Sequence, residues 1–366
     1  MSGLSKIIIS GGGSGGHIFP ALAIANALKH RYPNAEFLFV GAEGKMEMEK
    51  VPLAGYKIIG LKIAGFQRGE IIVNLTLPFK LLYSILKAFS IVLKFKPDVA
   101  IGVGGYASGP LLFVASVLRV PTIIQEQNAV AGLTNKLLSK FATTICVAYD
   151  DLIAVYSGKN VVKTGNPIRK EILCIGVSKE ESLKSFGLDS NKKTVLIIGG
   201  SLGAKTFNEA VKMNLELIKT LNIQLIWQTG SFYFEQYKNV ASGNPNIKCL
   251  KFIDRMDYAY TAADVIISRA GALSISELQV VGKPTIFVPS PNVTDDQQTK
   301  NVLSLERENA AIYIKDTEAV NTLFINLETL LENEERMAAL SKNIKALAIV
   351  DADSRIVDEI EKLVRK

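Results

Sequence analysis

Short apolar runs rich in β-branched residues alternate with longer stretches of helical character along the chain. The runs that we expect to form strands are 6–10, 36–40, 99–103, 121–125 and 144–147 in the first half, and 194–198, 224–228, 247–252, 265–268, 284–288 and 311–314 in the second. Strands that alternate with helices in this way indicate parallel sheets covered by helices on both faces. The predicted fold class is therefore α/β.

The two halves of the chain open in the same way. A strand, a glycine loop and a helical stretch follow one another at 6–10, 11–16 and 20–28, and again at 194–198, 199–204 and 207–217. This repetition predicts two Rossmann-like, doubly wound domains. Ligands bind at the carboxyl ends of the strands in such sheets, so two domains facing one another would enclose a central cleft lined by both glycine loops.

Turn-forming residues at 164–169 directly follow a strand pattern, and we place the hinge there. The expected domains are 1–165 and 166–345. A C-terminal helix at 346–366 is expected to pack back on the first domain.

One segment has the length of a membrane span. Residues 99–118 carry no charge over twenty positions, which meets the usual length criterion. Its middle contains Gly102, Gly104, Gly105, Gly109 and Pro110. A buried strand, a glycine loop and a buried helix therefore explain the segment better than a spanning helix.

Composition agrees with two folded domains. The chain has 366 residues, of which 48% are apolar and 21% charged, enough for two substantial cores. Cys146, Cys174 and Cys249 stand far apart without a C-x-x-C pair, so we expect buried reduced thiols and neither a disulfide framework nor a zinc site. No signal-peptide pattern precedes the run at 6–10, and we expect a cytoplasmic location.

The charge points to anionic partners. The formal net charge is +7, from 42 Lys and Arg against 35 Asp and Glu, which suits phosphates, nucleic acid or an anionic membrane. The basic residues are scattered lysines without an arginine-rich cluster or an aromatic-basic alternation. Nucleic acid is therefore the least favoured partner.

The first glycine loop admits more than one interpretation. Gly11-x-Gly13-x-x-Gly16 after a strand matches the dinucleotide fingerprint, so an NAD-dependent dehydrogenase is a competitor. That fingerprint expects an acidic residue at the end of the second strand, but the run at 36–40 is followed by Gly41 and Ala42. Tight turns needed only for packing are a further alternative.

A second glycine loop at 102–110 also follows a strand and opens a helix. The first half thus has two candidate anion cradles, and the loop at 199–204 adds another in the second half. Three cradles suit two phosphate-bearing ligands, a diphosphate donor and a diphosphate acceptor. This pattern favours glycosyl transfer.

Four motifs carry a specific resemblance. They are Gly-Gly-Gly-Ser-Gly-Gly-His-Ile-Phe-Pro-Ala-Leu-Ala at 11–23, Gln-Glu-Gln-Asn at 125–128 with Ala-Gly-Leu-Thr-Asn at 131–135, Thr-Gly-Asn-Pro-Ile-Arg at 164–169, and Ser-Arg-Ala-Gly-Ala-Leu-Ser-Ile-Ser-Glu at 268–277. Together they resemble the MurG family of GT-B glycosyltransferases over nearly the whole chain. Weaker support comes from 199–204, 252–254, 289–298 and Asn301. Leu202 and Gln297 depart from the family pattern, so no role is transferred to them.

The resemblance implies inverting transfer of N-acetylglucosamine from UDP-N-acetylglucosamine to the C4 hydroxyl of the MurNAc-pentapeptide of lipid I. The product would be lipid II, a step in peptidoglycan synthesis and hence in cell wall biogenesis, cell shape and cell division. It further implies a peripheral protein on the cytoplasmic face of the inner membrane. The N-terminal domain would bind the acceptor and the membrane, the C-terminal domain would bind UDP-N-acetylglucosamine, and no cofactor is expected.

Such a transfer needs stabilisation of the departing diphosphate. Ser201 and the N–H groups of the loops at Gly199 and Ala272 are expected to bind it at helix N-termini, with Arg169 as a cation. These groups would replace a metal, so no metal site is expected. The only D-x-D string, at 351–353, is expected to cap a helix.

The resemblance also assigns the donor pocket residue by residue. Glu277 would accept hydrogen bonds from both ribose hydroxyls, Ile253 would pack on the uracil, and Gln298 would reach the sugar. A solvated glutamate and plain core packing are the alternatives for Glu277 and Ile253. The donor-binding set also includes Ala272, Leu273, Ser274, Ile275 and Ser276.

His17 is the candidate general base, because an imidazole can take a proton near neutral pH. As a loop residue it could instead bind the acceptor or serve structure alone. Ser14, Gly15 and Gly16 are expected to bind substrate beside it. Asn128 is assigned to the donor sugar or the acceptor edge, since an amide is no base. The loop expected to bind the acceptor diphosphate contains Gly104, Gly105, Tyr106 and Ser108.

Two other classes remain open. The UDP-N-acetylglucosamine 2-epimerases share the architecture and would bind the same nucleotide sugar without a lipid acceptor. A non-catalytic lipid-binding module is the third class, which the intact donor motifs disfavour.

The stretch 71–97 contains no acidic residue and places Lys80, Lys87 and Lys94 seven residues apart among apolar residues. This spacing puts the lysines on one side of a helix. Such a helix would lie on an anionic membrane surface, or it would be an ordinary domain helix packed on its sheet.

Overall fold

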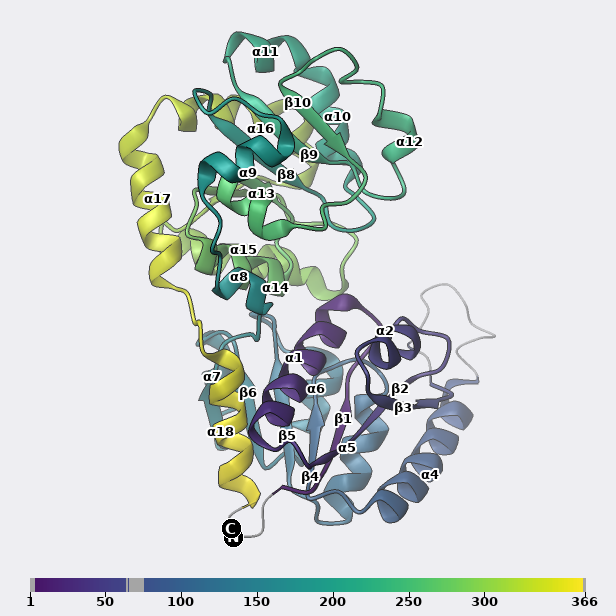
Figure 1. The fold of residues 1–366 in the computed structure, drawn as a ribbon. Helices are drawn as coiled ribbons and strands as arrows, with labels where there is room; N and C mark the ends of the chain where they lie inside the picture. Colours follow the sequence, from purple (N-terminus) through teal and green to yellow (C-terminus); the bar gives the residue numbers. More distant parts are fainter. Residues whose placement is uncertain (1–3, 64, 66–75, 365–366) are drawn as a thin grey trace. The chain divides into compact units, whose positions relative to one another are not determined.

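The structure, a computed structural model, describes residues 4–63, 65 and 76–364. The chain divides into two compact units (Figure 1). Unit 1 comprises Met1–Ile168 and Asp351–Lys366, and unit 2 comprises Arg169–Val350. The boundary between Ile168 and Arg169 falls inside the turn-rich segment, slightly beyond the position expected from the sequence.

A seven-stranded parallel sheet forms the centre of unit 1, in the order β3-β2-β1-β4-β5-β6-β7. Its strands are β1 (Lys6–Ser10), β2 (Glu36–Ala42), β3 (Lys57–Leu61), β4 (Val99–Gly102), β5 (Thr122–Glu126), β6 (Thr144–Val147) and β7 (Val161–Lys163). The helices of this unit are α1 (Gly15–Arg31), α2 (Glu47–Leu53), α4 (Leu77–Phe95), α5 (Ser108–Val117), α6 (Leu133–Leu138), α7 (Asp151–Val155) and α18 (Ala352–Val364).

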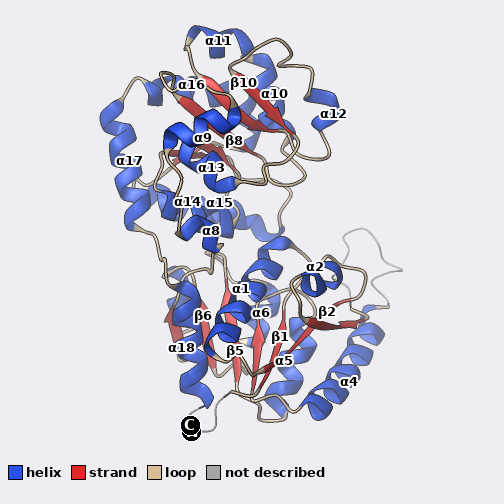
Figure 2. Ribbon diagram, in the orientation of Figure 1, coloured by secondary structure: helices blue, strands red, loops and turns tan. Residues whose placement is uncertain are grey.

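Both faces of this sheet are covered, as Figure 2 shows. Ile7 and Ile9 of β1 belong to a core shared with α1 and α18, whereas Ile8 belongs to a core shared with α4 and α5. Successive side chains of a strand point to opposite faces, so a strand between two helical layers has to be apolar throughout. This is why the strands of the sheet are visible as apolar runs in the sequence.

The uncharged segment 99–118 folds as expected into β4, a glycine loop and α5. No helix among the described residues is long and apolar enough to cross a bilayer.

The C-terminal segment returns to unit 1. Helix α18 contacts α1, and its Ile356, Val357 and Ile360 enter the core of the sheet. The hydroxyl of Tyr32 donates to Glu361 Oε1 at 2.7 Å. The helix expected at 346–366 is shorter, because α17 ends at Ala346 and α18 begins at Ala352; residues 365–366 lie outside the described residues.

Unit 2 contains a six-stranded parallel sheet in the order β10-β9-β8-β11-β12-β13. Its strands are β8 (Thr194–Ile198), β9 (Gln224–Gln228), β10 (Ile247–Leu250), β11 (Val265–Ser268), β12 (Thr285–Phe287) and β13 (Ile312–Tyr313). Its helices are α8 (Lys170–Leu173), α9 (Lys179–Phe186), α10 (Lys205–Met213), α11 (Leu215–Thr220), α12 (Phe234–Tyr237), α13 (Met256–Ala262), α14 (Ala272–Val281), the 3₁₀ helix η1 (Thr294–Asp296), α15 (Gln297–Arg307), α16 (Asp316–Leu331) and α17 (Glu334–Ala346).

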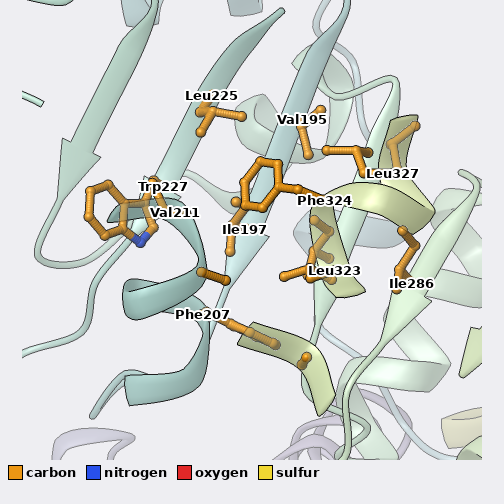
Figure 3. Packing of buried hydrophobic residues seen from close by; sticks show 14 of the residues in the cluster. Val195, Ile197, Phe207, Val211, Leu225, Trp227, Ile286, Leu323, Phe324 and Leu327 are labelled. Atoms are coloured by element: carbon orange, nitrogen blue, oxygen red, sulfur yellow. The ribbon is translucent and has the colours of Figure 1, made fainter. Parts of the chain in front are cut away.

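Large side chains fill the core of unit 2 (Figure 3). Phe207 and Val211 of α10, Trp227 of β9 and Phe324 of α16 are almost fully buried. The indole Nε1 of Trp227 donates to Asn208 Oδ1 at 2.9 Å, so the one polar atom of this ring is satisfied. The predicted pair of Rossmann-like domains is confirmed. In each sheet the first three strands of the unit lie in reverse order, and the fourth strand lies on the other side of the first.

Several elements differ from the sequence-based expectation. Strand β3 was not expected. The helical stretch 207–217 is divided at Asn214, which ends α10 and precedes α11. Helix α1 begins at Gly15 rather than Pro20, so His17 lies in its first turn and not in a loop. Cys174 is exposed, contrary to the expected burial of all three thiols.

Candidate functional site

The strand order reverses between β1 and β4 in unit 1 and between β8 and β11 in unit 2. Connections leave in opposite directions at such a point and open a crevice at the carboxyl ends of the strands. All four loops that follow these strands are glycine loops or glycine-containing helix starts. Topology therefore places the candidate site of each unit at these loops.

In unit 1 the side chain of Glu47 accepts a hydrogen bond from the loop after β1. This side chain is fully buried, and its Oε2 accepts the Gly13 N–H at 2.9 Å while its Oε1 accepts the Ala42 N–H at 2.9 Å. The N–H groups of Gly15 and Gly16 belong to the first turn of α1 and have no acceptor within the helix. Together with the hydroxyl of exposed Ser14, they can bind a phosphate.

The ring of His17 lies between two glycine loops. Its Nδ1 is 3.1 Å from the carbonyl oxygen of Gly12 and 3.4 Å from Ser14 Oγ. Its Nε2 side faces Gly104, where a Cβ atom would lie 2.8 Å from Nε2. Burial lowers the pKa of His17, and the charges of Glu126 and Glu47 oppose this shift.

The loop after β4 packs backbone to backbone against the first loop. Gly104 and Gly105 adopt φ values of 91° and 86°, which only glycine adopts without strain. A Cβ atom on Gly105 would lie 2.3 Å from the carbonyl oxygen of Gly12. Tyr106 is exposed, whereas Ser108 is buried and its hydroxyl donates to the Gly105 carbonyl at 2.8 Å. Ser108 thus closes the loop, and Tyr106 is its exposed side chain, with the ring lying beside Gly65.

The Gln-Glu-Gln-Asn motif ends β5 with a buried carboxylate. Glu126 Oε2 accepts the Gly132 N–H and the Asn135 amide, both at 2.9 Å. Its Oε1 accepts the Asn128 N–H at 3.2 Å. Glu126 therefore fixes the loop that carries Asn128, a half-buried residue beside the candidate site.

Buried amides connect this motif to the segment before the unit boundary. Gln125 Nε2 donates to Asn166 Oδ1 at 2.9 Å, and Asn166 Nδ2 donates to the Gln127 carbonyl at 3.0 Å. Three of the four sequence motifs thus have a structural role in shaping unit 1.

In unit 2 the guanidinium of Arg169 binds Glu277 through two parallel hydrogen bonds. Nε donates to Oε1 and Nη2 donates to Oε2, each at 2.7 Å. The buried Tyr260 hydroxyl donates to the same Oε2 at 3.2 Å. Hydrogen bonding to Glu277 raises the pKa of Arg169, and burial followed by the Glu277 charge raises the pKa of Tyr260. Two residues that the sequence assigned to different parts of the donor are therefore partners here.

Helix α14 presents unsatisfied donors at its start. Gly271 is the N-cap and supplies no side-chain cap, so the N–H groups of Ala272, Leu273 and Ser274 precede the first helical acceptor. The Ile275 N–H already bonds to Gly271 at 2.9 Å. Ile275 is buried, and the Ser276 hydroxyl donates to the Ala272 carbonyl. At this helix start, the groups available to an anion are therefore backbone N–H groups rather than these side chains.

The loop after β8 packs closely against the loop after β9 through glycines. A Cβ atom on Gly203 would lie 2.0 Å from the Thr229 carbonyl, and one on Gly230 would lie 2.1 Å from the Gly203 nitrogen. The Ser231 N–H bonds to the Ser201 carbonyl at 3.0 Å. Ser201 remains exposed with its hydroxyl available.

Gln298 and Ile253 complete the expected set. Gln298 Oε1 accepts the Ser290 N–H at 2.8 Å and the Ala270 N–H at 3.2 Å. These bonds fix the orientation of the amide and leave its NH₂ group to donate to a ligand. Ile253 is buried.

Four residues that shape the candidate sites were not predicted from the sequence. Tyr260 and Glu47 lie outside the motifs, and Glu126 and Arg269 lie within motifs but had no expected role. Arg269 donates to the carbonyls of Val288 and Pro289 at 3.0 and 3.1 Å, which ties the start of the α14 loop to the end of β12. Both Glu126 and Arg269 lie directly after a run expected to form a strand, which was the available signal for them. The D-x-D string lies at the start of α18. Asp353 Oδ1 accepts the Ser354 N–H of the first turn at 2.8 Å, whereas the Asp351 carboxylate pairs with Arg355 at 2.8 Å.

Comparison with known proteins agrees with the resemblance inferred from the motifs. The glycosyltransferase family 28 N-terminal domain matches residues 7–147, and the glycosyltransferase family 28 C-terminal domain matches residues 194–356. A relative from Flavobacterium psychrophilum is 52% identical over 359 residues, covering 98% of each chain. Its name describes an N-acetylglucosamine transferase acting between UDP-N-acetylglucosamine and N-acetylmuramyl-(pentapeptide) pyrophosphoryl-undecaprenol.

Solved structures show the same architecture. MurG of Acinetobacter baumannii is 31% identical with a TM-score of 0.80, covering 98% of this chain and 99% of that one. A UDP-GlcNAc 2-epimerase from Neisseria meningitidis, bound to UDP-GlcNAc, has a TM-score of 0.66 at 14% identity, covering 98% of this chain and all of that one. The second likeness shows the fold alone. With family models matching both units and a relative 52% identical along almost its whole length, the chain belongs to glycosyltransferase family 28.

Proposed function

We propose that this enzyme transfers N-acetylglucosamine from UDP-N-acetylglucosamine to the C4 hydroxyl of undecaprenyl-pyrophosphoryl-MurNAc-pentapeptide, with inversion, to form lipid II. The observation that carries the proposal is the full-length identity of 52% with a relative named for this transfer. The loops described above supply matching chemistry, since unit 1 and unit 2 each have phosphate-binding groups at the strand reversal.

The donor is assigned to unit 2. The N–H groups that open α14, the Ser201 hydroxyl and Arg169 bind the diphosphate, and Glu277 binds the ribose. Arg169 and Glu277 are already paired at 2.7 Å, so donor binding exchanges part of this ion pair for contacts with the diphosphate and the ribose. Each partner then keeps a charge-assisted hydrogen bond, which limits the desolvation cost.

The acceptor is assigned to unit 1. His17 takes the proton of the C4 hydroxyl through Nε2, a bond forms between that oxygen and the anomeric carbon, and the bond from this carbon to the diphosphate breaks. UDP leaves with the electron pair. The N–H groups of Gly15 and Gly16 and the loop at Gly104 and Gly105 bind the acceptor diphosphate, with Tyr106 at its edge.

The pH dependence of kcat/KM for the acceptor should reflect His17. The base acts in its neutral form, and burial lowers its pKa from the ordinary value of 6.5. The acid limb of the profile should therefore have its midpoint below pH 6.5. Rates measured from about pH 5 to about pH 8 check this, and an acid limb centred above 6.5 would exclude His17 as its source.

Purified enzyme supplied with UDP-N-acetylglucosamine and a polyprenyl-pyrophosphoryl-MurNAc-pentapeptide should release UDP and form a β-linked disaccharide, seen by mass spectrometry and NMR. Without acceptor, no sugar nucleotide should change. Formation of UDP-N-acetylmannosamine without acceptor would contradict the proposal and support the epimerase alternative.

Helix α4 supplies the proposed contact with the membrane. Phe79, Leu82, Leu86, Phe89 and Leu93 are exposed on it at a spacing of three to four residues, with Phe79 at 76% and Leu86 at 63% exposure. This spacing forms one continuous apolar stripe, while α4 also packs on α5 through a separate face. The stripe supports a peripheral location on a membrane surface, which we assign to the anionic, cytoplasmic face. Residues 71–75 of the expected segment lie outside the described residues.

Replacing Lys80, Lys87 and Lys94 by glutamate should weaken binding to anionic vesicles, since each lysine near the surface contributes about 1 kcal/mol. Lys87 already pairs with Glu43 at 3.2 Å, so Lys80 and Lys94 should account for most of the loss. Vesicle sedimentation at moderate salt measures the effect.

The matched control carries glutamate at Lys212, Lys219 and Lys342, three exposed lysines of unit 2, and has the same net charge. It should sediment nearly as wild type does. Equal losses for both variants would mean that overall charge, and not α4, directs the attachment.

A further inference from the structure

A single peptide group connects a buried carboxylate to His17. The N–H of Gly13 donates to Glu47 Oε2 at 2.9 Å, and the carbonyl of Gly12, on the same peptide group, lies 3.1 Å from His17 Nδ1. We propose that Glu47 is a positioning residue that fixes the tautomer and orientation of His17 through the Gly12–Gly13 peptide group. This inference rests on the proposed role of His17 as the base.

The chain is built for a carboxylate at this place. A Cβ atom on Gly12 would lie 2.1 Å from Glu47 Oε1, and one on Gly41 would lie 2.5 Å from Glu47 Cγ. Both glycines therefore leave the space that the side chain fills. Glu47 is fully buried at the start of α2. Burying a carboxylate costs free energy unless hydrogen bonds replace its lost hydration.

Two donors meet this carboxylate. The N–H groups of Ala42 and Gly13 each point at a different oxygen. A carboxylate offers two acceptors, whereas glutamine offers one acceptor and a pair of donors. Glutamate therefore fits this site better than glutamine does.

The hydrogen bonds act in series. A carboxylate that accepts the Gly13 N–H polarises the peptide group and makes the Gly12 carbonyl a stronger acceptor. That carbonyl then binds the Nδ1–H of His17 and leaves Nε2 unprotonated as the proton acceptor. The result resembles the role of an aspartate behind a catalytic histidine, with one peptide group inserted between the two side chains.

The charge of Glu47 acts in the same direction as that of Glu126. Both raise the pKa of His17 against the stronger effect of burial. Ser14 Oγ, at 3.4 Å from Nδ1, is the neutral polar group on the same side. Removal of Glu47 should therefore lower the pKa of His17 further and move the acid limb of kcat/KM to lower pH.

In Glu47→Gln, kcat should fall by up to about a hundredfold because the base is misplaced, while the affinity for UDP-N-acetylglucosamine should stay unchanged. Glu47→Asp keeps both acceptors on a shorter stem and should recover part of the rate. Glu49→Gln removes the same charge from an exposed residue of the same helix and serves as the control, with wild-type kcat and pH profile.

NMR of the imidazole nitrogens gives a readout that does not depend on activity. The chain has two histidines, His17 and His30, so a His30→Gln background leaves one ring to observe. His17 should be protonated at Nδ1 in wild type, and Glu47→Gln should lose this preference together with the lowered pKa. A wild-type ring protonated at Nε2, or a Gln variant with the wild-type tautomer and pKa, would overturn the inference.

A wild-type ring protonated at Nε2 would overturn the inference without any variant. If Glu47→Gln does not fold, the same NMR comparison with Glu47→Asp tests whether the tautomer and pKa of His17 depend on Glu47. A His17→Ala enzyme with normal turnover would refute the catalytic proposal alone, because the tautomer and its dependence on Glu47 would still stand.

Discussion

Replacing His17 with alanine should lower turnover by about 10² to 10⁴-fold, the usual effect of removing a general base. The affinity for UDP-N-acetylglucosamine should remain that of wild type, since the donor is assigned to unit 2. The ring lies beside Gly104 with Nε2 directed at the loop proposed to bind the acceptor, so its loss removes the proton acceptor without disturbing the donor loops. Steady-state kinetics and calorimetry with UDP-N-acetylglucosamine separate the two quantities.

His30→Ala is the matched control. His30 is exposed near the end of α1, and its replacement should leave both kcat and KM intact. A fall in turnover below roughly threefold for His17→Ala would assign the ring to packing. A higher KM for the acceptor at unchanged kcat would identify it as a binding residue.

Replacing Glu277 with alanine should weaken UDP-N-acetylglucosamine binding roughly tenfold to a hundredfold. A charge-assisted hydrogen bond contributes about 1.5 to 3 kcal/mol, and the ribose would lose its carboxylate partner. The variant also removes the ion-pair partner of Arg169. The guanidinium then binds the diphosphate without first breaking an ion pair, which offsets part of the lost affinity for UDP. Calorimetry should therefore show a larger loss of affinity for uridine than for UDP.

Glu318→Ala, at an exposed glutamate of α16 in the same unit, controls for charge and should bind both ligands normally. Wild-type affinity of Glu277→Ala for both ligands would refute the ribose assignment. Equal losses for uridine and UDP would keep that assignment and refute the exchange of the ion pair.

The repeated strand, loop and helix pattern was enough to predict both sheets. A strand covered on both faces must be apolar throughout, so β1, β4, β8 and β11 are visible as runs in the sequence. Strand β3 was missed because it lies at the edge of its sheet, pairs only with β2 and is less completely buried. The break at Asn214 was missed because helical periodicity continues on both sides of it. The cleft expected between the domains stays a prediction.

Local chemistry along the chain predicted the glycine loops, His17 and Arg169, because glycines that admit phosphate and the polar residues beside them are neighbours in sequence. The assignment of Glu277 came from the motif resemblance. The fold decided which of them are partners. Arg169 and Glu277 are 108 positions apart, and Glu47 reaches Gly13 across 34; nothing in the run around Glu47 distinguishes it from the exposed Glu49. A hydrogen bond between distant residues depends on the packing of whole strands and helices, and that packing is a property of the folded chain rather than of any local pattern.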